Sequence, residues 1–426
     1  MFDALKIKVS IFINYFLFAI LLNSVGTVIL EAQRYFNISE SAASMIEVCK
    51  DISIALTSFL VASFVVRIGY KRSMLLALGL ISLACFIIPS VKTLLAIKIL
   101  FAVTGLCFAL TKVSVFGTIG LISGNRRAHI STMNFIESFF MMGVLAGYFI
   151  FSYYVNDGNI FSPRWFNVYY LLGGLSLAAF LLLLSSNLDE TLAKMNRVET
   201  KRNGLPEMLK LILLPVTISF VVCAFLYVLI EQGMMSWLPT FNNKVLQFSS
   251  VISIQVTSIF VAATALGRFI AGIILKKINW FIVLIFCLTA TAILVLISLQ
   301  MTNDSSAKEV SNWFGIPLTA YIFSLIGFFL APVYPAINSV ILASLPVSKH
   351  GMMSGLIVVF SALGGVTGSV ISGFIFQYYG GRTAFYFSLL PIAILIFALF
   401  VFEKKKNPGA ESLTFEGKRM QWASGG

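Results

Sequence analysis

Long runs of apolar residues, separated by short polar segments, fill this chain between residues 9 and 402. A helix needs about 20 mainly apolar residues to cross a lipid bilayer, and twelve runs fit that requirement. They cover residues 9–31, 44–66, 73–90, 94–120, 130–154, 166–185, 213–238, 249–275, 279–300, 314–344, 351–377 and 383–402. The pattern predicts an all-α membrane protein with twelve transmembrane helices in the lipid bilayer.

The composition points to the same class of protein. Of the 426 residues, 59% are hydrophobic and 11% are charged, whereas soluble domains contain about 45–50% apolar and about 25% charged residues. A soluble enzyme, a disordered chain and a nucleic-acid-binding protein are therefore disfavoured, and no nucleic-acid partner is expected. The five cysteines all lie in apolar runs without zinc-ligand spacing. No metal and no cofactor are expected.

Basic residues are distributed unevenly among the segments between the runs. With a cytoplasmic N-terminus, 20 Lys and Arg residues fall on the inner side and six on the outer side. The outer six are Arg34, Lys92, Arg164, Lys244, Lys308 and Arg382. The positive-inside rule places both termini in the cytoplasm, for a protein of the bacterial inner membrane. The net charge of +13 is then mostly a signal of topology.

A polar, charged segment between the sixth and seventh runs divides the chain into two halves. The predicted parts are an N-terminal six-helix bundle at 1–185, a cytoplasmic linker at 186–212, a C-terminal six-helix bundle at 213–403 and a cytoplasmic tail at 404–426. Glycines recur between the halves at offsets of 207 to 221 residues: Gly26 matches Gly233, and Gly143 matches Gly364. This repetition predicts two pseudo-symmetric bundles.

A basic loop follows the second run and contains Arg67, Gly69, Lys71 and Arg72. Together with twelve runs and a basic central linker, it resembles the major facilitator superfamily over residues 9 to 402. The resemblance implies that the two bundles rock around a central site, with this loop taking part in gating. The upstream aspartate expected in that loop is missing.

Four short segments resemble the fucose:proton symporter branch of that superfamily, including its TsgA-like members. They are Gly26-Thr27-Val28, Tyr35-Phe36-Asn37, Glu137-Ser138-Phe139-Phe140 and the stretch from Gln232 to Pro239. Fucose symporters carry acidic residues in spans one and four, where this chain has Thr27 and the basic stretch Leu110-Thr111-Lys112. Carboxylates in spans two and five would have to replace them, and a sugar acid or another carboxylate becomes a credible substrate.

Charged residues inside apolar runs mark candidate sites, because burying a charge in the bilayer is costly. Glu47, Lys50 and Asp51 have the i, i+3, i+4 spacing that places side chains on one helix face. One interpretation is a structural ion pair near the outer gate. The other is proton uptake or substrate contact by Asp51 or Glu47, since one lysine cannot neutralise two carboxylates.

Lys112 in span four and Glu137 in span five lie at similar depths, and we expect them to pair. The resemblance implies that span four lines the central cavity, so that Lys112 lies near substrate. The pair is interpreted either as a structural bridge or as an exchangeable site in which Glu137 takes the proton. A proton-coupling carboxyl group needs a pKa near the working pH, and burial and a neighbouring lysine act on that pKa in opposite directions.

Single polar residues complete the predicted substrate site, and interhelical hydrogen bonding is their alternative role. They are Asn23 and Thr27 in span one, Gln232 and Trp237 in span seven, and Asn338 in span ten, beside a kink expected at Tyr334-Pro335. Arg268 is expected to anchor a loop and is left out of the site.

The sequence contains neither a catalytic constellation nor a phosphate-binding Walker motif. We therefore expect a monomeric secondary active transporter of a small polar solute, such as a sugar or sugar acid, with protons as the coupling ion. Phe and Met residues keep an exporter of drugs, siderophores or other amphiphiles open as an alternative. A membrane sensor that has lost transport is the third possibility.

Overall fold

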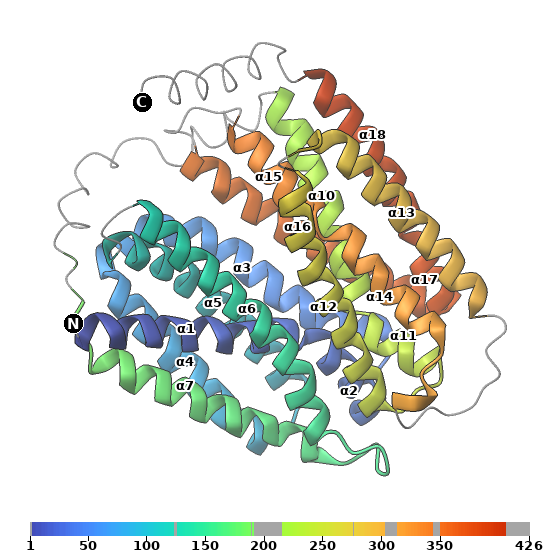
Figure 1. The fold of residues 1–426 in the computed structure, drawn as a ribbon. Coiled ribbons are helices and arrows are strands. Elements are labelled where there is room, and N and C mark those ends of the chain that lie inside the picture. Colours follow the sequence, from blue (N-terminus) through green and yellow to red (C-terminus); the bar gives the residue numbers. More distant parts are fainter. Residues whose placement is uncertain are drawn as a thin grey trace.

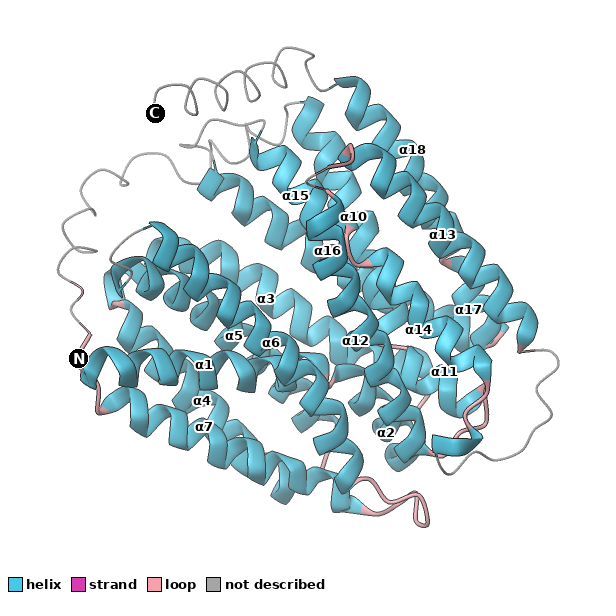
Figure 2. Ribbon diagram, viewed as in Figure 1, coloured by secondary structure: helices cyan, strands magenta, loops and turns pink. Residues whose placement is uncertain are grey.

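The computed structural model describes residues 2–122, 126–188, 190, 215–275, 277–302, 313–343 and 350–405. In this part of the chain all regular structure is helical (Figure 2). The helices are α1 (Phe2–Asn23), α2 (Val25–Phe36), α3 (Glu40–Ile68), α4 (Tyr70–Val91), α5 (Leu94–Ile122), α6 (Arg126–Tyr154), α7 (Val168–Leu184), α10 (Pro215–Met235), α11 (Leu238–Lys244), α12 (Ser250–Ile274), α13 (Trp280–Met301), α14 (Leu318–Leu330), α15 (Val333–Ala343), α16 (His350–Tyr379), α17 (Gly381–Phe387) and α18 (Leu389–Lys405), with short 3-10 turns at Pro163–Asn167 and Trp313–Gly315.

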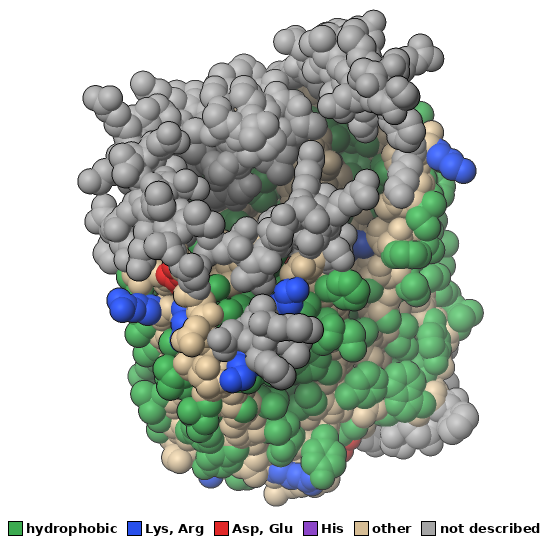
Figure 3. Space-filling view, turned by 60° about the vertical axis from the view of Figure 1, so that its left-hand side comes forward, with side chains coloured by type: hydrophobic (Ala, Val, Ile, Leu, Met, Phe, Trp, Pro, Cys, Tyr) green, Lys and Arg blue, Asp and Glu red, His purple; other side chains and the backbone are tan. Residues whose placement is uncertain are grey.

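Eleven stretches of the described chain are long and apolar enough to cross a membrane. Helix α3 carries Glu40, Glu47, Lys50 and Asp51 in its first half and an apolar run in its second half. Its 29 residues nevertheless extend about 44 Å, which exceeds the hydrocarbon thickness. Hydrophobic side chains cover most of the visible described flank of the molecule (Figure 3). The prediction of an all-α membrane protein is confirmed.

Four of the predicted spans are broken rather than continuous. Breaks separate α1 from α2 at Ser24, α10 from α11 at Ser236 and Trp237, α14 from α15 at Ala331 and Pro332, and α17 from α18 at Ser388. The kink expected at Tyr334-Pro335 is therefore placed wrongly. Pro332 lies at the break itself, whereas Pro335 lies in the first turn of α15, where a missing N–H costs little.

The breaks of α1–α2 and α10–α11 meet each other. A Cβ atom on Gly26 would lie 2.7 Å from the Ser236 carbonyl oxygen, so only glycine permits this approach of the two backbones. Spans one and seven, which correspond to each other in the predicted repeat, thus contact at their break points.

Helices α1–α7 pack mainly with one another, and so do α10–α18; we call these groups the N-terminal and C-terminal bundles. Between them, α3 packs along α16, α6 along α12 and α2 against α11. The bundles diverge toward the side where α1 begins and α18 ends, which we call the terminal side (Figure 1). The predicted linker at 186–212 and tail at 404–426 lie almost entirely outside the described residues.

Hydrogen bonds between the two bundles gather at the other end, which we call the opposite side. Glu40 accepts from Lys244 at 2.6 Å, Ser152 from Gln255 at 3.2 Å, and the Asp157 carboxylate from the Ser250 backbone N–H at 2.8 Å. Further bonds join Gln33 to Thr240, Arg34 to Ser250 and Ser41 to Gln377. These contacts close the molecule on the opposite side.

Candidate functional site: a charged cavity between two helical bundles

A cavity of about 320 Å³ lies between the bundles and is lined by both of them. Its polar and charged lining residues are Asn23, Lys50, Asp51, Lys112, Glu231, Gln232, Thr264, Arg268, Tyr334 and Ser361. Its apolar lining includes Phe108, Phe140, Met141 and Met235. Charged side chains from four different helices therefore meet in one space inside the membrane-spanning region.

The predicted group on α3 forms a buried ionic cluster, which we call the α3 triad. The Lys50 ammonium lies 3.3 Å from a Glu47 oxygen and 3.3 Å from an Asp51 oxygen. All three residues are buried, and the other Glu47 oxygen has no hydrogen-bond partner. The triad thus holds two carboxylates around one cation, as the spacing predicts.

The α3 triad also touches the C-terminal bundle. The Ser236 hydroxyl, at the break between α10 and α11, donates to Glu47 at 2.9 Å. A Cβ atom on Gly365 of α16 would lie only 2.6 Å from an Asp51 oxygen. The triad therefore lies at a contact that any relative movement of the bundles must change.

Lys112 lines the cavity, as predicted, but the expected ion pair with Glu137 is absent between these two described side chains. The Lys112 ammonium lies 5.7 Å from the centre of the Phe108 ring. Glu137 is exposed and does not line the cavity, although it interacts electrostatically with both Lys112 and Arg268. It lies one turn of α6 before Phe140, on the same face but nearer the terminal side.

Arg268 lines the cavity and does not anchor a loop, so that expectation is wrong. The Arg268 guanidinium lies 3.2 Å from a Glu231 oxygen, which also accepts from the Tyr227 hydroxyl at 2.8 Å. Helix α12 continues to Ile274, which places Arg268 about 9 Å inside the helix end. Its depth in the run, together with Glu231 at a similar depth in span seven, is the signal that could have identified this pair.

Aromatic side chains form part of both walls. Phe108 and Phe140 of the N-terminal bundle have ring centres 6.1 Å apart. In the C-terminal bundle, Tyr334 stacks on Tyr227 with ring centres 5.4 Å apart, and its hydroxyl lies 2.9 Å from the Ser361 hydroxyl. The cavity can therefore contact a flat apolar group from both sides.

The structure brings only some of the predicted polar residues to the cavity. Asn23 and Gln232 line it, but Thr27, Trp237 and Asn338 do not. Trp237 is fully buried and donates to the Ser369 carbonyl oxygen at 3.0 Å, and the Thr27 hydroxyl is buried without a partner. Trp237 therefore supports packing of α11 on α16 and does not face a solute in this arrangement.

The basic loop ties the start of α4 to the chain after α7. Gly69 has a φ of +100°, and the Lys71 backbone N–H donates to Glu190 at 2.7 Å. The Lys71 ammonium donates to the Leu184 carbonyl oxygen at 3.1 Å, while Arg72 is exposed. The Arg67 side chain lies outside the described residues. The predicted gating role of this loop stays a prediction.

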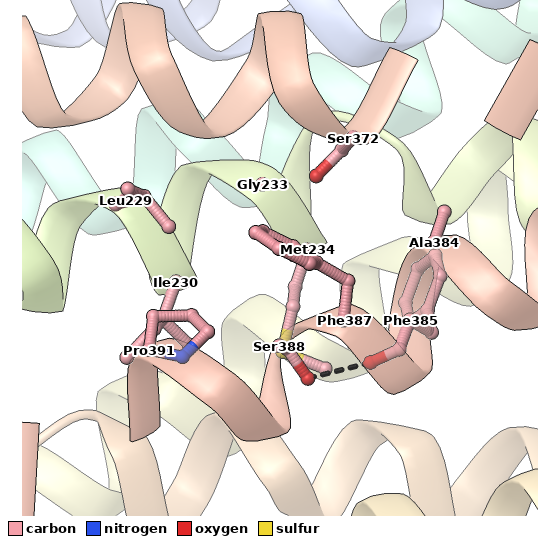
Figure 4. A pocket seen from close by; sticks show the side chains of 10 residues that line it. All are labelled: Leu229, Ile230, Gly233, Met234, Ser372, Ala384, Phe385, Phe387, Ser388 and Pro391. Carbon is pink, nitrogen blue, oxygen red and sulfur yellow. Dashed lines mark hydrogen bonds between the residues drawn. The ribbon is translucent and has the colours of Figure 1, made fainter. Parts of the chain in front are cut away.

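A separate small void behind α10 is a packing feature. It measures about 10 Å³ and is surrounded by side chains without a charge (Figure 4). The Ser388 hydroxyl beside it donates to the Phe385 carbonyl oxygen at 2.6 Å, so its polar atom is already satisfied. The void is too small and too apolar to hold a polar solute.

Comparisons with known proteins identify the family. The model of the Major Facilitator Superfamily matches residues 11–316 and 282–424, which together span nearly all of the chain. The chain belongs to the Major Facilitator Superfamily. It is therefore an integral membrane protein and a secondary transporter of small solutes, and not an enzyme.

Curated relatives agree with the predicted TsgA-like resemblance, which is confirmed. The chain is 23% identical over 408 residues to "Protein TsgA homolog" of Buchnera aphidicola subsp. Schizaphis graminum (strain Sg), covering 95% of this chain and 98% of that protein. It is also 23% identical over 402 residues to the homolog of Buchnera aphidicola subsp. Acyrthosiphon pisum (strain Tuc7), covering 93% and 96%.

Solved structures share the fold. The nucleoside transporter NupG superposes with a TM-score of 0.72 at 15% identity, covering 95% of this chain and 100% of that one. The D-xylose-proton symporter superposes with a TM-score of 0.68 at 13% identity, covering 95% and 98%. At these identities the likeness establishes the arrangement of helices.

Proposed function

We propose that this chain moves a small polar solute across the cytoplasmic membrane together with protons, by rocking of its two bundles around the charged cavity. The observation that carries the proposal is that both bundles contribute charged side chains to one cavity, while the bonds between the bundles among the described residues gather on the opposite side. A site at the interface of two bundles, alternately exposed to either side, is the arrangement that alternating access requires.

The proposed orientation rests on the distribution of basic residues. The positive-inside rule assigns the terminal side to the cytoplasm, so the opposite side faces outward. In this arrangement the cavity is closed to the outside by contacts such as Glu40–Lys244 and Asp157–Ser250. Outward opening has to break these contacts and the Ser236–Glu47 hydrogen bond.

The α3 triad is the proposed proton site, with Asp51 as its first candidate because it lines the cavity. Two buried carboxylates around one ammonium leave an unbalanced negative charge, which is costly inside a membrane. A proton on Asp51 or Glu47 removes that charge. Because the Ser236 bond to Glu47 depends on the closed arrangement, proton binding and bundle movement influence each other.

Glu137 becomes a secondary candidate for proton coupling. Its side chain is exposed near the terminal side and makes no ion pair with Lys112 among the described side chains. It still attracts Lys112 and Arg268 electrostatically. We assign it to the mouth of the cavity, where it influences solute entry and not the buried charge balance.

The proposed solute is a sugar, a sugar acid or a similar hydroxylated or carboxylated metabolite. Asn23, Gln232, Thr264 and Ser361 supply hydrogen-bonding groups to the cavity, and Lys112 supplies a charge. Proteins with the same fold include a nucleoside transporter and a D-xylose-proton symporter, which supports solutes of this size.

Uptake into proteoliposomes under an imposed inward proton gradient tests the proposal. We expect the wild-type protein to accumulate a solute from a panel of sugars and sugar acids. Asp51→Asn should exchange the same solute across the membrane but lose accumulation. Glu403→Gln, which changes a carboxyl group at the end of α18, is the matched control and should behave as the wild type. Equal accumulation by Asp51→Asn would contradict coupling through the triad.

Export of amphiphilic compounds is a second candidate function, favoured by Phe108, Phe140, Met141 and Met235 in the cavity wall. Inside-out membrane vesicles distinguish the two directions. Proton-driven loading of such vesicles with a lipophilic cation would favour export, whereas its absence together with uptake by right-side-out vesicles supports the symport proposal.

A further inference from the structure

We infer that the solute selected by this cavity is an organic anion, a ring-bearing carboxylate held between Lys112 of the N-terminal bundle and Arg268 of the C-terminal bundle. This inference rests on the proposed transport function and narrows it to one substrate class. Four observations carry it: an unpaired lysine, an arginine with free donors, aromatic walls on both sides and the charge balance of the cavity.

Lys112 is the lining cation that has no carboxylate within ion-pair distance among the described side chains. Asp51 is engaged by Lys50 at 3.3 Å, and Glu231 by Arg268 at 3.2 Å and by Tyr227 at 2.8 Å. An ammonium group withdrawn from bulk water needs a counter-ion or several acceptors. The anionic group of a solute would supply that counter-ion.

Arg268 supplies the second half of the clamp. A guanidinium group has five N–H donors; that of Arg268 uses Nη2 in the pair with Glu231 and also interacts with the Tyr227 hydroxyl. The Nε atom is buried and has no hydrogen-bond partner. The Arg268 side chain is 35% exposed where it lines the cavity, so a carboxylate there can accept from Arg268 and Lys112 with the charge-assisted geometry that arginine favours.

The walls favour a flat apolar body attached to that carboxylate. Phe108 and Phe140 face the cavity from one bundle and Tyr334 from the other. The volume of about 320 Å³ is at the lower end of typical small-molecule sites, which suits a single ring and not a larger amphiphile. Polar groups such as Asn23 and Gln232 can bind ring substituents.

The charge balance joins this solute to the proposed proton site. With every group in its ordinary ionised form, the α3 triad carries one negative charge, Lys112 one positive charge, and Glu231 and Arg268 cancel. A bound monoanion leaves one uncompensated negative charge, and a proton on Asp51 or Glu47 restores neutrality. Tyr148 of α6 is the other titratable group that interacts with Glu47. For the groups in the cavity and the triad, with Glu137 outside the lining, this count predicts one proton for each monoanion.

The clamp also explains why solute binding would promote movement of the bundles. Lys112 lies on α5 and Arg268 on α12, so one carboxylate bound to both cations links the two bundles. The bundles diverge on the terminal side in the present arrangement. Binding of an anion would favour their approach, which a neutral solute of the same shape would not do.

Binding to the purified full-length protein tests the clamp. The first pair of probes is 4-hydroxybenzoate and 4-hydroxybenzamide, which have the same aromatic ring and differ in charge. The second pair is glucuronate and glucose, which also differ in charge but have no aromatic ring. Isothermal titration should show binding of 4-hydroxybenzoate at least about tenfold tighter than of its amide, as loss of a charge-assisted hydrogen bond predicts. Glucuronate should bind more tightly than glucose and less tightly than 4-hydroxybenzoate.

Variants identify the residues. Lys112→Met should weaken 4-hydroxybenzoate binding by about tenfold or more, whereas Lys98→Met on the same helix, outside the cavity lining, should change it less than about twofold. Arg268→Gln should weaken binding more than Arg268→Lys, which keeps the charge. Arg268→Gln leaves the Glu231 carboxylate without its cation and can fail to fold for that reason. In that case the double variant Glu231→Gln, Arg268→Gln, which also removes that carboxylate, is measured in place of the single variant.

Each outcome decides the inference. Equal binding of acid and amide, unchanged binding in Lys112→Met, or no binding of either acid to folded protein would overturn the clamp. Tighter binding of glucuronate than of 4-hydroxybenzoate would overturn the preference for an aromatic ring but leave the preference for an anion standing. Counterflow of labelled solute in proteoliposomes tests the proposed transport function separately from the clamp. Glucose transport without binding of either acid would support transport and overturn the clamp. Acid binding without transport of any probe would support the clamp and overturn the proposed transport.

Discussion

Two ionic groups line the same cavity, and they differ in charge balance and in position. Glu231 and Arg268 form a matched pair within the C-terminal bundle, on α10 and α12. The α3 triad has one carboxylate too many and is bonded to Ser236 of the other bundle. A balanced pair within one bundle can persist while the bundles move. An unbalanced group at their interface has to change its bonds or its protonation, which makes the triad the better candidate for a coupling site.

The largest effect is expected when the triad loses its cation. Lys50→Met leaves two buried carboxylates without their cation, and breaking a buried ion pair in this way costs about 3–5 kcal/mol. We expect severe loss of folded protein, measured by thermal unfolding in detergent. Adding Glu47→Gln and Asp51→Asn to Lys50→Met should restore folding but not proton-driven accumulation. Normal folding of the single variant would show that the lysine does not hold the cluster together.

The same comparison shows what the sequence could and could not predict. The spacing of Glu47, Lys50 and Asp51 was sufficient to place three charges on one helix face, because a continuous helix fixes that geometry. The Lys112–Glu137 pair failed because depth along two helices does not determine their rotation about their axes. Arg268 was misassigned because a charged residue near the end of an apolar run resembles a boundary.

The breaks in the spans were not predictable from hydrophobic pattern. Ser24 lies in an apolar run that predicts a continuous helix, whereas the run containing Ala331 predicts a kink at Pro335 and not at Pro332. The break at Ser24 lies next to the close approach of Gly26 to the Ser236 carbonyl oxygen, a tertiary contact that hydropathy does not encode. Hydropathy fixed the number and the order of the spans, while the composition of the cavity depended on contacts between residues far apart in the sequence.

A smaller effect is expected from adding a side-chain atom where the α1–α2 break contacts the α10–α11 break. Gly26→Ala introduces a Cβ atom 2.7 Å from the Ser236 oxygen, and such overpacking costs about 1–3 kcal/mol. It should weaken closure on the opposite side and move Glu47 away from Ser236. Labelling of a cysteine placed near Asn243 by an external thiol reagent should increase. Gly174→Ala, where nothing lies within 4 Å, is the control and should leave labelling unchanged.

A modest effect is expected at the mouth of the cavity. Glu137 is exposed and outside the cavity lining, so Glu137→Gln should reduce accumulation less than about threefold, as surface substitutions do. Asp51→Asn should abolish it. Comparison of the two variants under the same proton gradient measures the difference. A complete loss in Glu137→Gln with normal accumulation in Asp51→Asn would move the proton site to α6.

The smallest effect is expected at the rim of the closed side. The Lys244 side chain is 40% exposed where it pairs with Glu40, and exposed ion pairs contribute about 0.2–1 kcal/mol. Lys244→Gln should therefore change the midpoint of thermal unfolding slightly, and the change should disappear at high salt. A large, salt-independent loss would mean that this rim contact, and not the α3 triad, dominates closure.

Proton movement during solute movement tests coupling through the triad most directly. In proteoliposomes without an imposed gradient, addition of a transported solute should raise the external pH as protons enter with it, and Asp51→Asn should move solute by exchange with no such change. Solute entry without proton movement in the wild-type protein, or unchanged proton movement in Asp51→Asn, would contradict the assignment of the α3 triad as the proton site.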